Sequence, residues 1–217
     1  MVMRHNHSEV SLRGYVLAGG ASSRFGSDKA LVELGGKTAL TRVTEVLRQS
    51  GVREVVVVGG HACCATMSAR CLEDRWPGEG PLGAIVTALL CSLAAEPPPS
   101  WNLVVSCDMP FLTAHWLAYM IGRAAGSDAD VIVPQSAGGR FEPLCACWRT
   151  ACAEPLRAVF ESGVRKVTGG MQHFRVEVLG EKDWKRFDNQ GRLFWNMNTR
   201  ADYEEAKRIL AAGRERQ

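Results

Sequence analysis

Short, mostly apolar runs alternate with segments in which apolar residues recur at helical spacing. The runs predict buried strands at residues 15–18, 54–58, 101–106 and 131–133. The segments between them predict helices at residues 38–49, 81–93 and 115–125. Such an alternation is typical of an α/β protein whose parallel sheet is covered by helices on both faces.

The pattern becomes less regular after residue 134. Further strands are predicted at 142–148 and 175–179, and further helices near 152–161 and 202–212. We find no repeat and no linker, and the chain of 217 residues has the length of one large domain. We therefore expect a flexible tail at 1–13 and a single domain at 14–212, in which residues 135–212 cap residues 14–134 and complete a cleft.

Composition narrows the possible functions. The chain is 46% hydrophobic and 23% charged, and its 26 Lys and Arg against 23 Asp and Glu give a net charge of +3. This weak excess is far from that of a dedicated nucleic-acid binder and suits a small anionic substrate. No apolar run reaches the roughly 18 residues of a membrane span, and the polar start is unlike a signal peptide. We expect a cytoplasmic protein that binds neither nucleic acid nor membrane.

The eight cysteines raise the alternatives of disulfides or a metal site. The densest group is Cys145, Cys147 and Cys152, and its spacing lacks the paired cysteines and the histidines of common zinc sites. A chain of this size does not need disulfides, and cytosolic thiols stay reduced. We expect structural, reduced thiols here, and also at four others that lie in or beside apolar segments: Cys63, Cys64, Cys71 and Cys91.

The strongest chemical signal is the glycine-rich segment 17–29, directly after the first predicted strand. It combines three glycines with two cations: Gly19, Gly20, Gly26, Arg24 and Lys29. Glycines let the backbone N–H groups approach phosphate oxygens, and the cations add fixed positive charge. A plain glycine-rich turn is the alternative, although it needs fewer glycines and no cations. The segment therefore predicts a phosphate-binding loop.

Two familiar nucleotide motifs do not fit the spacing. Gly19 and Gly20 are adjacent, which excludes the G-x-G-x-x-G pattern. The sequence Gly36-Lys37-Thr38 resembles the end of a Walker A loop, but the first glycine of that motif would fall at Leu31. Lys37 and Thr38 are instead expected to start the first helix.

The second signal is Asp108, which follows the apolar strand at 101–106. Pro110 keeps Met109 extended and prevents an immediate helix. A carboxylate at the end of such a strand, close to the glycine-rich loop, is suited to hold Mg²⁺ beside substrate phosphates. The alternative is an aspartate that only caps a helix or forms a turn.

A third signal is the pair Asn196 and Asn198, which an extended chain would place on the same side. Their amides are predicted to reach the metal or the acceptor. The alternative role of this segment is structural, because Thr199 and Asp202 form a near capping box for the last helix. Weaker candidates, each otherwise an ordinary surface charge, are Asp74, Arg140, Glu142, Arg165 and Lys166.

Four motifs together resemble the molybdenum cofactor guanylyltransferase family. They are L-A-G-G-x-S-x-R-F-G-x-D-K at 17–29, G-P-L at 80–82, C-D-M-P at 107–110 and N-x-N-T at 196–199. The resemblance spans nearly the whole chain, and the first motif is specific for the wider nucleotidyltransferase superfamily. It implies a three-layer α/β/α, Rossmann-like nucleotidyltransferase fold with a mostly parallel central sheet. Residues 14–134 would then bind the nucleotide and residues 135–212 the acceptor.

The resemblance also implies roles for individual residues. GTP would be contacted by Leu17, Ala18, Gly19, Gly20, Lys29, Asp74 and Asp108. Related cytidylyl- and uridylyltransferases have alanine at the position of Gly20, and the missing methyl group leaves room for a purine. Many guanylyl relatives carry an asparagine after the second strand, where this chain has Gly59-Gly60.

The implied reaction transfers GMP from GTP to the terminal phosphate of molybdopterin or its molybdenum-loaded form and releases pyrophosphate. Arg24, Lys29 and Asp108 would be catalytic, with Mg²⁺ held by Asp108 and Asn198. The acceptor would be bound by Asn196, Asn198 and Arg140, and maturation proteins of molybdoenzymes are possible partners. Two alternatives stay open: a cytidylyl- or sugar-phosphate nucleotidyltransferase, and a non-catalytic nucleotide-binding protein that delivers the cofactor.

Overall fold

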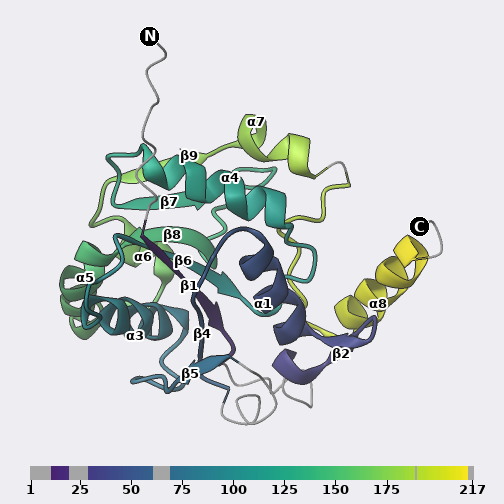
Figure 1. Cartoon of the computed structure of the whole chain (residues 1–217), viewed down its shortest axis with the longest axis horizontal. Helices are drawn as coiled ribbons and strands as arrows, with labels where there is room; N and C mark the ends of the chain where they lie inside the picture. The colour runs from purple at the N-terminus through teal and green to yellow at the C-terminus, as the bar shows by residue number, and fades with distance from the viewer. Residues whose placement is uncertain (1–10, 20–28, 61–68, 189, 215–217) are drawn as a thin grey trace.

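The centre of the molecule is a seven-stranded β-sheet in the computed structural model, which describes residues 11–19, 29–60, 69–188 and 190–214. The strands are β1 (Leu12–Leu17), β4 (Val55–Val58), β5 (Arg70–Leu72), β6 (Trp101–Ser106), β7 (Val131–Pro134), β8 (Cys145–Arg149) and β9 (Val176–Leu179). Their order is β5-β4-β1-β6-β8-β7-β9 (Figure 1). Only β8 runs antiparallel to its neighbours β6 and β7, so the predicted mostly parallel sheet is confirmed.

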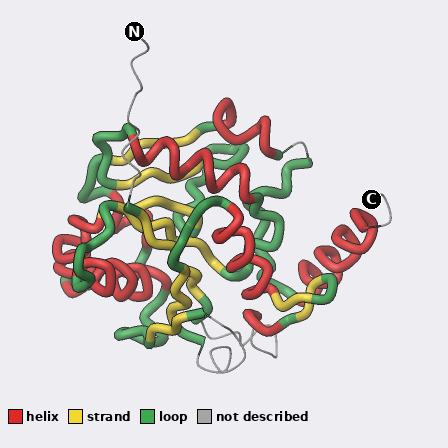
Figure 2. Tube along the Cα trace, viewed as in Figure 1, coloured by secondary structure: helices red, strands yellow, loops and turns green. Residues whose placement is uncertain are grey.

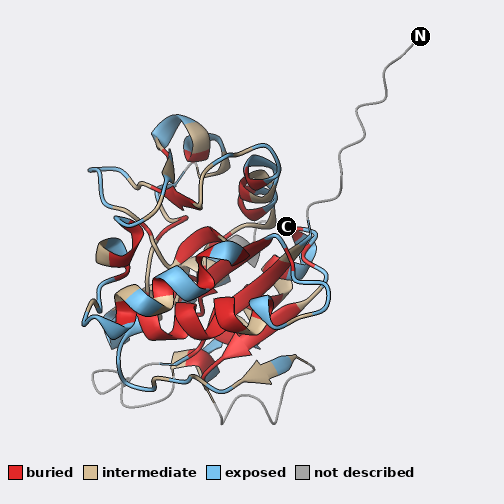
Figure 3. Cartoon of the chain, turned by 90° about the vertical axis from the view of Figure 1, so that its left-hand side faces the viewer, coloured by how far each residue is buried: buried red, intermediate tan, exposed pale blue. Residues whose placement is uncertain are grey.

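Helices cover both faces of the sheet (Figure 2). One face packs against α1 (Ala39–Gln49) and α4 (Ala114–Ala125). The other packs against α3 (Pro81–Leu93), α5 (Ala153–Glu161) and α6 (Val167–Met171). The inner strands of the sheet and the inner sides of the helices are buried (Figure 3), whereas the edge strands β5 and β9 are largely half-buried or exposed. These two apolar cores confirm the three-layer α/β/α prediction.

Local sequence signals explain where the first helices begin. The Thr38 hydroxyl accepts a hydrogen bond of 3.1 Å from the backbone N–H of Thr41, which caps α1. Thr38 thus marks the helix start, as predicted, whereas Lys37 lies in the short strand β3 (Lys37–Thr38) before the helix and not in its first turn. Pro81 occupies the first turn of α3, where its missing N–H costs nothing, and Thr113 caps α4 in the same way as Thr38 caps α1.

Several short elements were not predicted because they are too brief to carry a periodic pattern. They are β5, the hairpin of β2 (Glu33–Leu34) and β3 (Lys37–Thr38), the helices α6 and α7 (Glu181–Trp184), and the 3₁₀ turns η1 (Lys29–Leu31), η2 (Thr150–Cys152) and η3 (Lys185–Phe187). The last helix, α8 (Arg200–Arg214), lies beside β2 and projects from the body (Figure 1). In the described part of the chain, no helix has the length and apolar character to cross a membrane.

The strand predicted at 142–148 begins later than expected. β8 starts at Cys145, and Glu142 belongs to the turn that joins it to β7, where Gln135 and Phe141 form an isolated bridge. The N–H of Glu142 donates to the carbonyl oxygen of Pro134 at 2.9 Å, and the N–H of Cys145 donates to the carbonyl oxygen of Glu142 at 3.0 Å. Glu142 therefore sits at the edge of the sheet rather than inside a strand.

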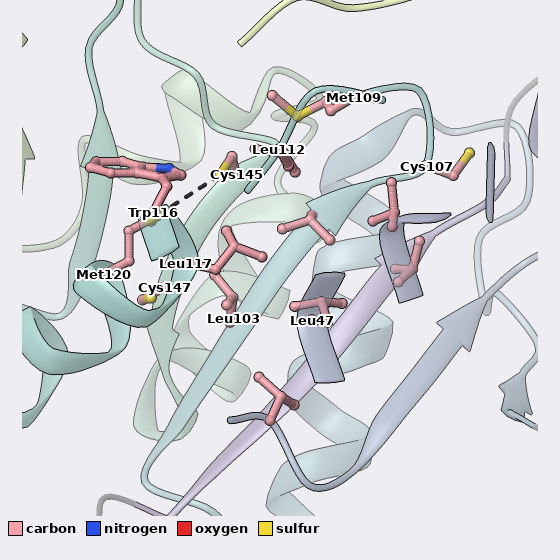
Figure 4. Packing of buried hydrophobic residues seen from close by; sticks show 14 of the residues in the cluster. Leu47, Leu103, Cys107, Met109, Leu112, Trp116, Leu117, Met120, Cys145 and Cys147 are labelled. Carbon is pink, nitrogen blue, oxygen red and sulfur yellow. Dashed lines mark hydrogen bonds between the residues drawn. The ribbon is translucent and has the colours of Figure 1, made fainter. Parts of the chain in front are cut away.

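The cysteines of β8 are structural, as predicted. Cys145 and Cys147 are fully buried against Trp116, Leu117 and Met120 of α4 (Figure 4). Burial raises the pKa of the Cys145 thiol to about 12 and also raises that of Cys147. Cys71 in β5 is disulfide-bonded, so the expectation of a reduced thiol is wrong at this position.

Candidate active site

One pocket opens where the strands β1 and β6 end, and a second is lined by the turn between β7 and β8 and by residues 184–202. The first pocket has a volume of about 320 Å³ and receives Leu17, Ala18 and Gly19 from the end of β1. Its other lining residues include Lys29, Asp74, Gly78, Gly80, Ser106 and Asp108. The structure therefore brings together every described residue that was expected to contact the nucleotide. Gly20 and Arg24 lie outside the described residues, so their predicted roles stay predictions.

Asp108 is the second residue after the end of β6 and lines this pocket. Its Oδ1 atom is buried and accepts no hydrogen bond from the described part of the chain. Burial raises the pKa of the carboxyl group, and this effect is opposed by the Ser106 hydroxyl and by the charge of Lys29. A buried carboxylate oxygen without a partner is a vacant ligand position suited to a cation.

The second pocket has a volume of about 450 Å³, and its residue Asn198 is hydrogen-bonded to Lys29 of the first. It brings together Arg140, Asn196 and Asn198, the three residues that were expected to bind the acceptor. The walls also include aromatic and acidic residues, namely Glu142, Trp184, Asp188, Phe194, Trp195 and Asp202.

Two hydrogen bonds link the residues of the two pockets beside Asp108. The N–H of Met197 donates to the carbonyl oxygen of Asp108 at 2.9 Å. Lys29 of the first pocket donates from Nζ to Oδ1 of Asn198 in the second, at 3.3 Å. A cation, a carboxylate and an amide thus lie between a cavity at the glycine-rich loop and a cavity at the C-terminal segment.

The segment after Asn198 also has the expected structural role. The N–H of Thr199 donates to the Asp202 carboxylate at 2.7 Å, and the N–H of Asp202 donates to the Thr199 hydroxyl at 3.1 Å. These reciprocal bonds form the predicted capping box of α8 and hold the asparagines at the pocket. The capping contacts lower the pKa of Asp202 against the opposing effect of burial.

Asp74 shapes the loop that closes the first pocket. Its Oδ1 accepts hydrogen bonds from the N–H of Trp76 at 3.1 Å and from the Thr87 hydroxyl at 3.0 Å. These bonds tie the loop to α3, while the residue still lines the pocket. Asp74 therefore has a structural role in addition to the nucleotide contact that was expected.

Gly59, at the end of β4, packs against the start of the glycine-rich loop. Its φ is +77°, and a Cβ atom placed on it would lie 3.0 Å from both the Cα and the N of Gly19. This close approach requires glycine, which explains why the position after β4 is occupied by Gly59 in this chain.

Sequence reasoning missed Ser106 and Trp184 as pocket residues. Ser106 is the last residue of an apolar strand, and its position two residues before Asp108 was the available signal. Trp184 reaches the second pocket from α7, where its Nε1 donates to the carbonyl oxygen of Gln135 at 2.8 Å. That contact depends on tertiary packing, which no local pattern reveals.

Among the described residues, no group of three or more His, Cys, Asp or Glu side chains gathers as a closed metal site would. The single carboxylate of Asp108 fits a divalent ion that takes its remaining ligands from substrate phosphates and water, which is the usual behaviour of Mg²⁺.

The fold and the paired pockets define a nucleotidyltransferase. A MobA-like NTP transferase domain matches residues 14–176. A probable molybdenum cofactor guanylyltransferase of Pelotomaculum thermopropionicum is 32% identical over 91% of this chain and 92% of its own length. The chain belongs to the MobA-like NTP transferase family, which confirms the predicted family and enzyme class.

Solved structures share the fold. Molybdopterin-guanine dinucleotide biosynthesis protein A of Archaeoglobus fulgidus has a TM-score of 0.78 at 24% identity, covering 92% of this chain and 99% of its own. Rv0371C of Mycobacterium tuberculosis, in complex with manganese, has a TM-score of 0.63 at 15% identity, covering 91% and 98%.

Proposed function

We propose that this enzyme transfers GMP from GTP to the terminal phosphate of molybdopterin, or of its molybdenum-loaded form, and releases pyrophosphate. The observation that carries the proposal is the junction of the two pockets at Asp108, with Lys29 and Asn198 joined across it. The names of the curated relatives support guanine as the base and molybdopterin as the acceptor. In this scheme residues 14–134 bind the nucleotide and residues 135–212 bind the acceptor.

The first pocket is proposed to hold GTP. The backbone at Leu17, Ala18 and Gly19 lines the cavity and can lie close to the nucleotide because no bulky side chain intervenes at Gly19. Lys29 supplies positive charge next to Asp108, where the α-phosphate would react. Arg24 and Gly20 are proposed to contribute further charge and space for the purine.

The second pocket is proposed to hold the acceptor, with its terminal phosphate toward Asn196 and Asn198. A phosphate monoester has a second pKa of about 6, so it is anionic at neutral pH and needs no general base. The difficulty is to bring two anions together, and the protein meets it by positioning and by charge neutralisation. Lys29, placed between the pockets, offsets charge on both partners.

Asp108 and Asn198 are proposed to hold Mg²⁺. The buried, unpartnered Oδ1 of Asp108 supports this role, and carboxylate and amide oxygens are ligands that Mg²⁺ accepts. When bound, the ion would neutralise charge at the reacting phosphorus and on the leaving pyrophosphate.

Pyrophosphate release in the presence of molybdopterin, compared across GTP, CTP, ATP and UTP, tests the proposal. We expect release with GTP that depends on both molybdopterin and Mg²⁺. Preferential release with CTP would indicate a cytidylyltransferase instead. Tight GTP binding without any pyrophosphate release would indicate a delivery protein.

A further inference from the structure

We propose that Glu142 recognises the pterin ring of the acceptor and that Arg140 is a positioning residue for its carboxylate. The carboxylate oxygens would accept hydrogen bonds from the ring N3–H and from the 2-amino group. This inference rests on the proposed function, because it assumes that the second pocket holds a pterin-containing acceptor.

Glu142 is unusually well buried for a residue with a charged side chain. Only 5% of the residue is exposed, although it lines the second pocket. Its ion-pair partner Arg140 has a side chain that is 71% exposed. A buried carboxylate is costly unless hydrogen bonds satisfy its lone pairs, and a single, largely exposed partner satisfies them poorly. This imbalance indicates that a ligand in the pocket completes the set of hydrogen bonds.

The two oxygens of Glu142 have different surroundings. Arg140 donates from Nε at 3.1 Å and from Nη2 at 2.9 Å, and both bonds reach Oε1. Within the described ranges, Oε2 accepts no hydrogen bond. The backbone on either side of the carboxylate is fixed by the bonds to Pro134 and Cys145 described above. A carboxylate has about four lone-pair sites, so both oxygens can still accept from a ligand.

The pocket that Glu142 lines also has aromatic walls. Trp184 and Phe194 pack edge to face and are almost fully buried, and the partly buried Trp195 adds apolar surface for a flat ring. Trp184 is held by its bond to the carbonyl oxygen of Gln135. Asn196 and Asn198 also line this pocket, and their segment is hydrogen-bonded to Asp108. An acceptor with its phosphate at the asparagines would therefore extend its ring toward Glu142.

The chemistry of the ring edge favours a carboxylate. A 2-amino-4-oxopteridine presents the N3–H and the 2-amino group side by side, and two donors in a row match the two acceptors of a carboxylate. Guanine has the same edge. The base of GTP, however, is proposed to lie in the first pocket, whose lining does not include Glu142. We therefore assign Glu142 to the pterin.

Substitution by glutamine gives a sharp test. Lumazine, a 2,4-dioxopteridine, has an acceptor where pterin has the 2-amino donor. Glutamine offers one acceptor and one donor, so Glu142→Gln would complement lumazine and oppose pterin. Dissociation constants of free pterin and free lumazine would be measured by fluorescence for the wild type and for Glu142→Gln, with Glu181→Gln, an exposed carboxylate in α7, as the control.

We expect the wild type and Glu181→Gln to bind pterin about tenfold or more tightly than lumazine, and Glu142→Gln to reverse the preference. Glu142→Asp, which keeps the two acceptors, should still prefer pterin. Because the readout is a ratio of two ligands, a general loss of folded protein does not imitate it. Arg140→Ala should weaken pterin binding without reversing the preference.

Equal affinity for the two ligands in the wild type, including no detectable binding of either, would overturn the inference. The inference would also be overturned if Glu142→Gln still preferred pterin to lumazine, or if Glu142→Gln weakened GTP binding while pterin binding was unchanged. Wild-type GMP transfer to molybdopterin is measured in parallel, so the inference can fail while the proposed function stands. If the wild type does not transfer GMP to molybdopterin, the proposed function is wrong whatever the result of the pterin-binding measurements.

Discussion

The backbone N–H of Met197 donates a hydrogen bond of 2.9 Å to the carbonyl oxygen of Asp108. This bond attaches the C-terminal segment to the end of β6. It sets Asn196 and Asn198 on either side of the attachment point, so that the second pocket begins where the first one ends.

Replacing Asp108 by asparagine should lower kcat by about a hundredfold or more, because the variant loses the negative charge that is proposed to hold Mg²⁺. The same change should raise the free energy of unfolding at pH 8. Burial raises the pKa of Asp108, which means that the folded protein disfavours its charged form. Steady-state kinetics and urea unfolding of the two proteins measure both effects.

The stability difference between Asp108→Asn and the wild type should depend on pH. With a raised pKa in the folded state, protonated Asp108 contributes stability at low pH, and this contribution is lost as the pH rises through the folded pKa. The difference should therefore vanish below the ordinary pKa of aspartate and be largest above the folded pKa. A variant that is less stable than the wild type at pH 8 would contradict this account.

Asn198→Ala should reduce kcat/KM about tenfold to a hundredfold, since it removes the amide oxygen that contacts Lys29 and is proposed to bind the metal. Thr199→Ala is the matched control in the next position. It removes the cap of α8 and should cost about 1 kcal/mol of unfolding free energy with little effect on turnover. Equal losses of activity in both variants would assign the segment a structural role only.

Gly59→Ala should raise the KM for GTP. The added methyl group would press on the backbone of Gly19, which lines the first pocket. Gly51→Ala is the control, because Gly51 has a φ of +98° and open space around it. Both variants should lose about 1–2 kcal/mol from backbone strain, but only Gly59→Ala should change the KM. An unchanged KM in Gly59→Ala would show that the loop tolerates the displacement.

Cys145 and Cys147 should resist alkylation in the native protein. Their burial and raised pKa values leave almost no thiolate at pH 8. Iodoacetamide treatment followed by peptide mass spectrometry should find both unmodified until the protein is denatured. Rapid labelling of Cys145 in the folded enzyme would contradict the structural role.

The sheet and the main helices follow from the sequence because each has a strong local signal. The run of four β-branched valines at Val55–Val58 predicts a buried strand, the cap Thr38 marks the start of α1, and the first-turn proline Pro81 marks the start of α3. The antiparallel β8 has no such signal, because a buried strand reads the same in either direction. Its direction is set by pairing with β6 and β7.

The candidate site residues that belong to a sequence motif could be identified from the sequence. Lys29, Asp108 and Asn198 were identified from separate segments, and the fold brings them together. Trp184 and the burial of Glu142 were not predictable, because they depend on how α7 and the turn before β8 pack against the end of the sheet. The second pocket is assembled by tertiary contacts rather than by a contiguous pattern.

The most direct test of the central claim follows the α-phosphate. The enzyme would be incubated with molybdopterin, Mg²⁺ and GTP labelled either at the α- or at the γ-phosphorus. The account predicts that the α-label enters a product containing molybdopterin while the γ-label leaves as pyrophosphate, with neither event in Asp108→Asn. Retention of the α-label in GTP, or its release as GMP independently of molybdopterin, would contradict a transfer between the two pockets.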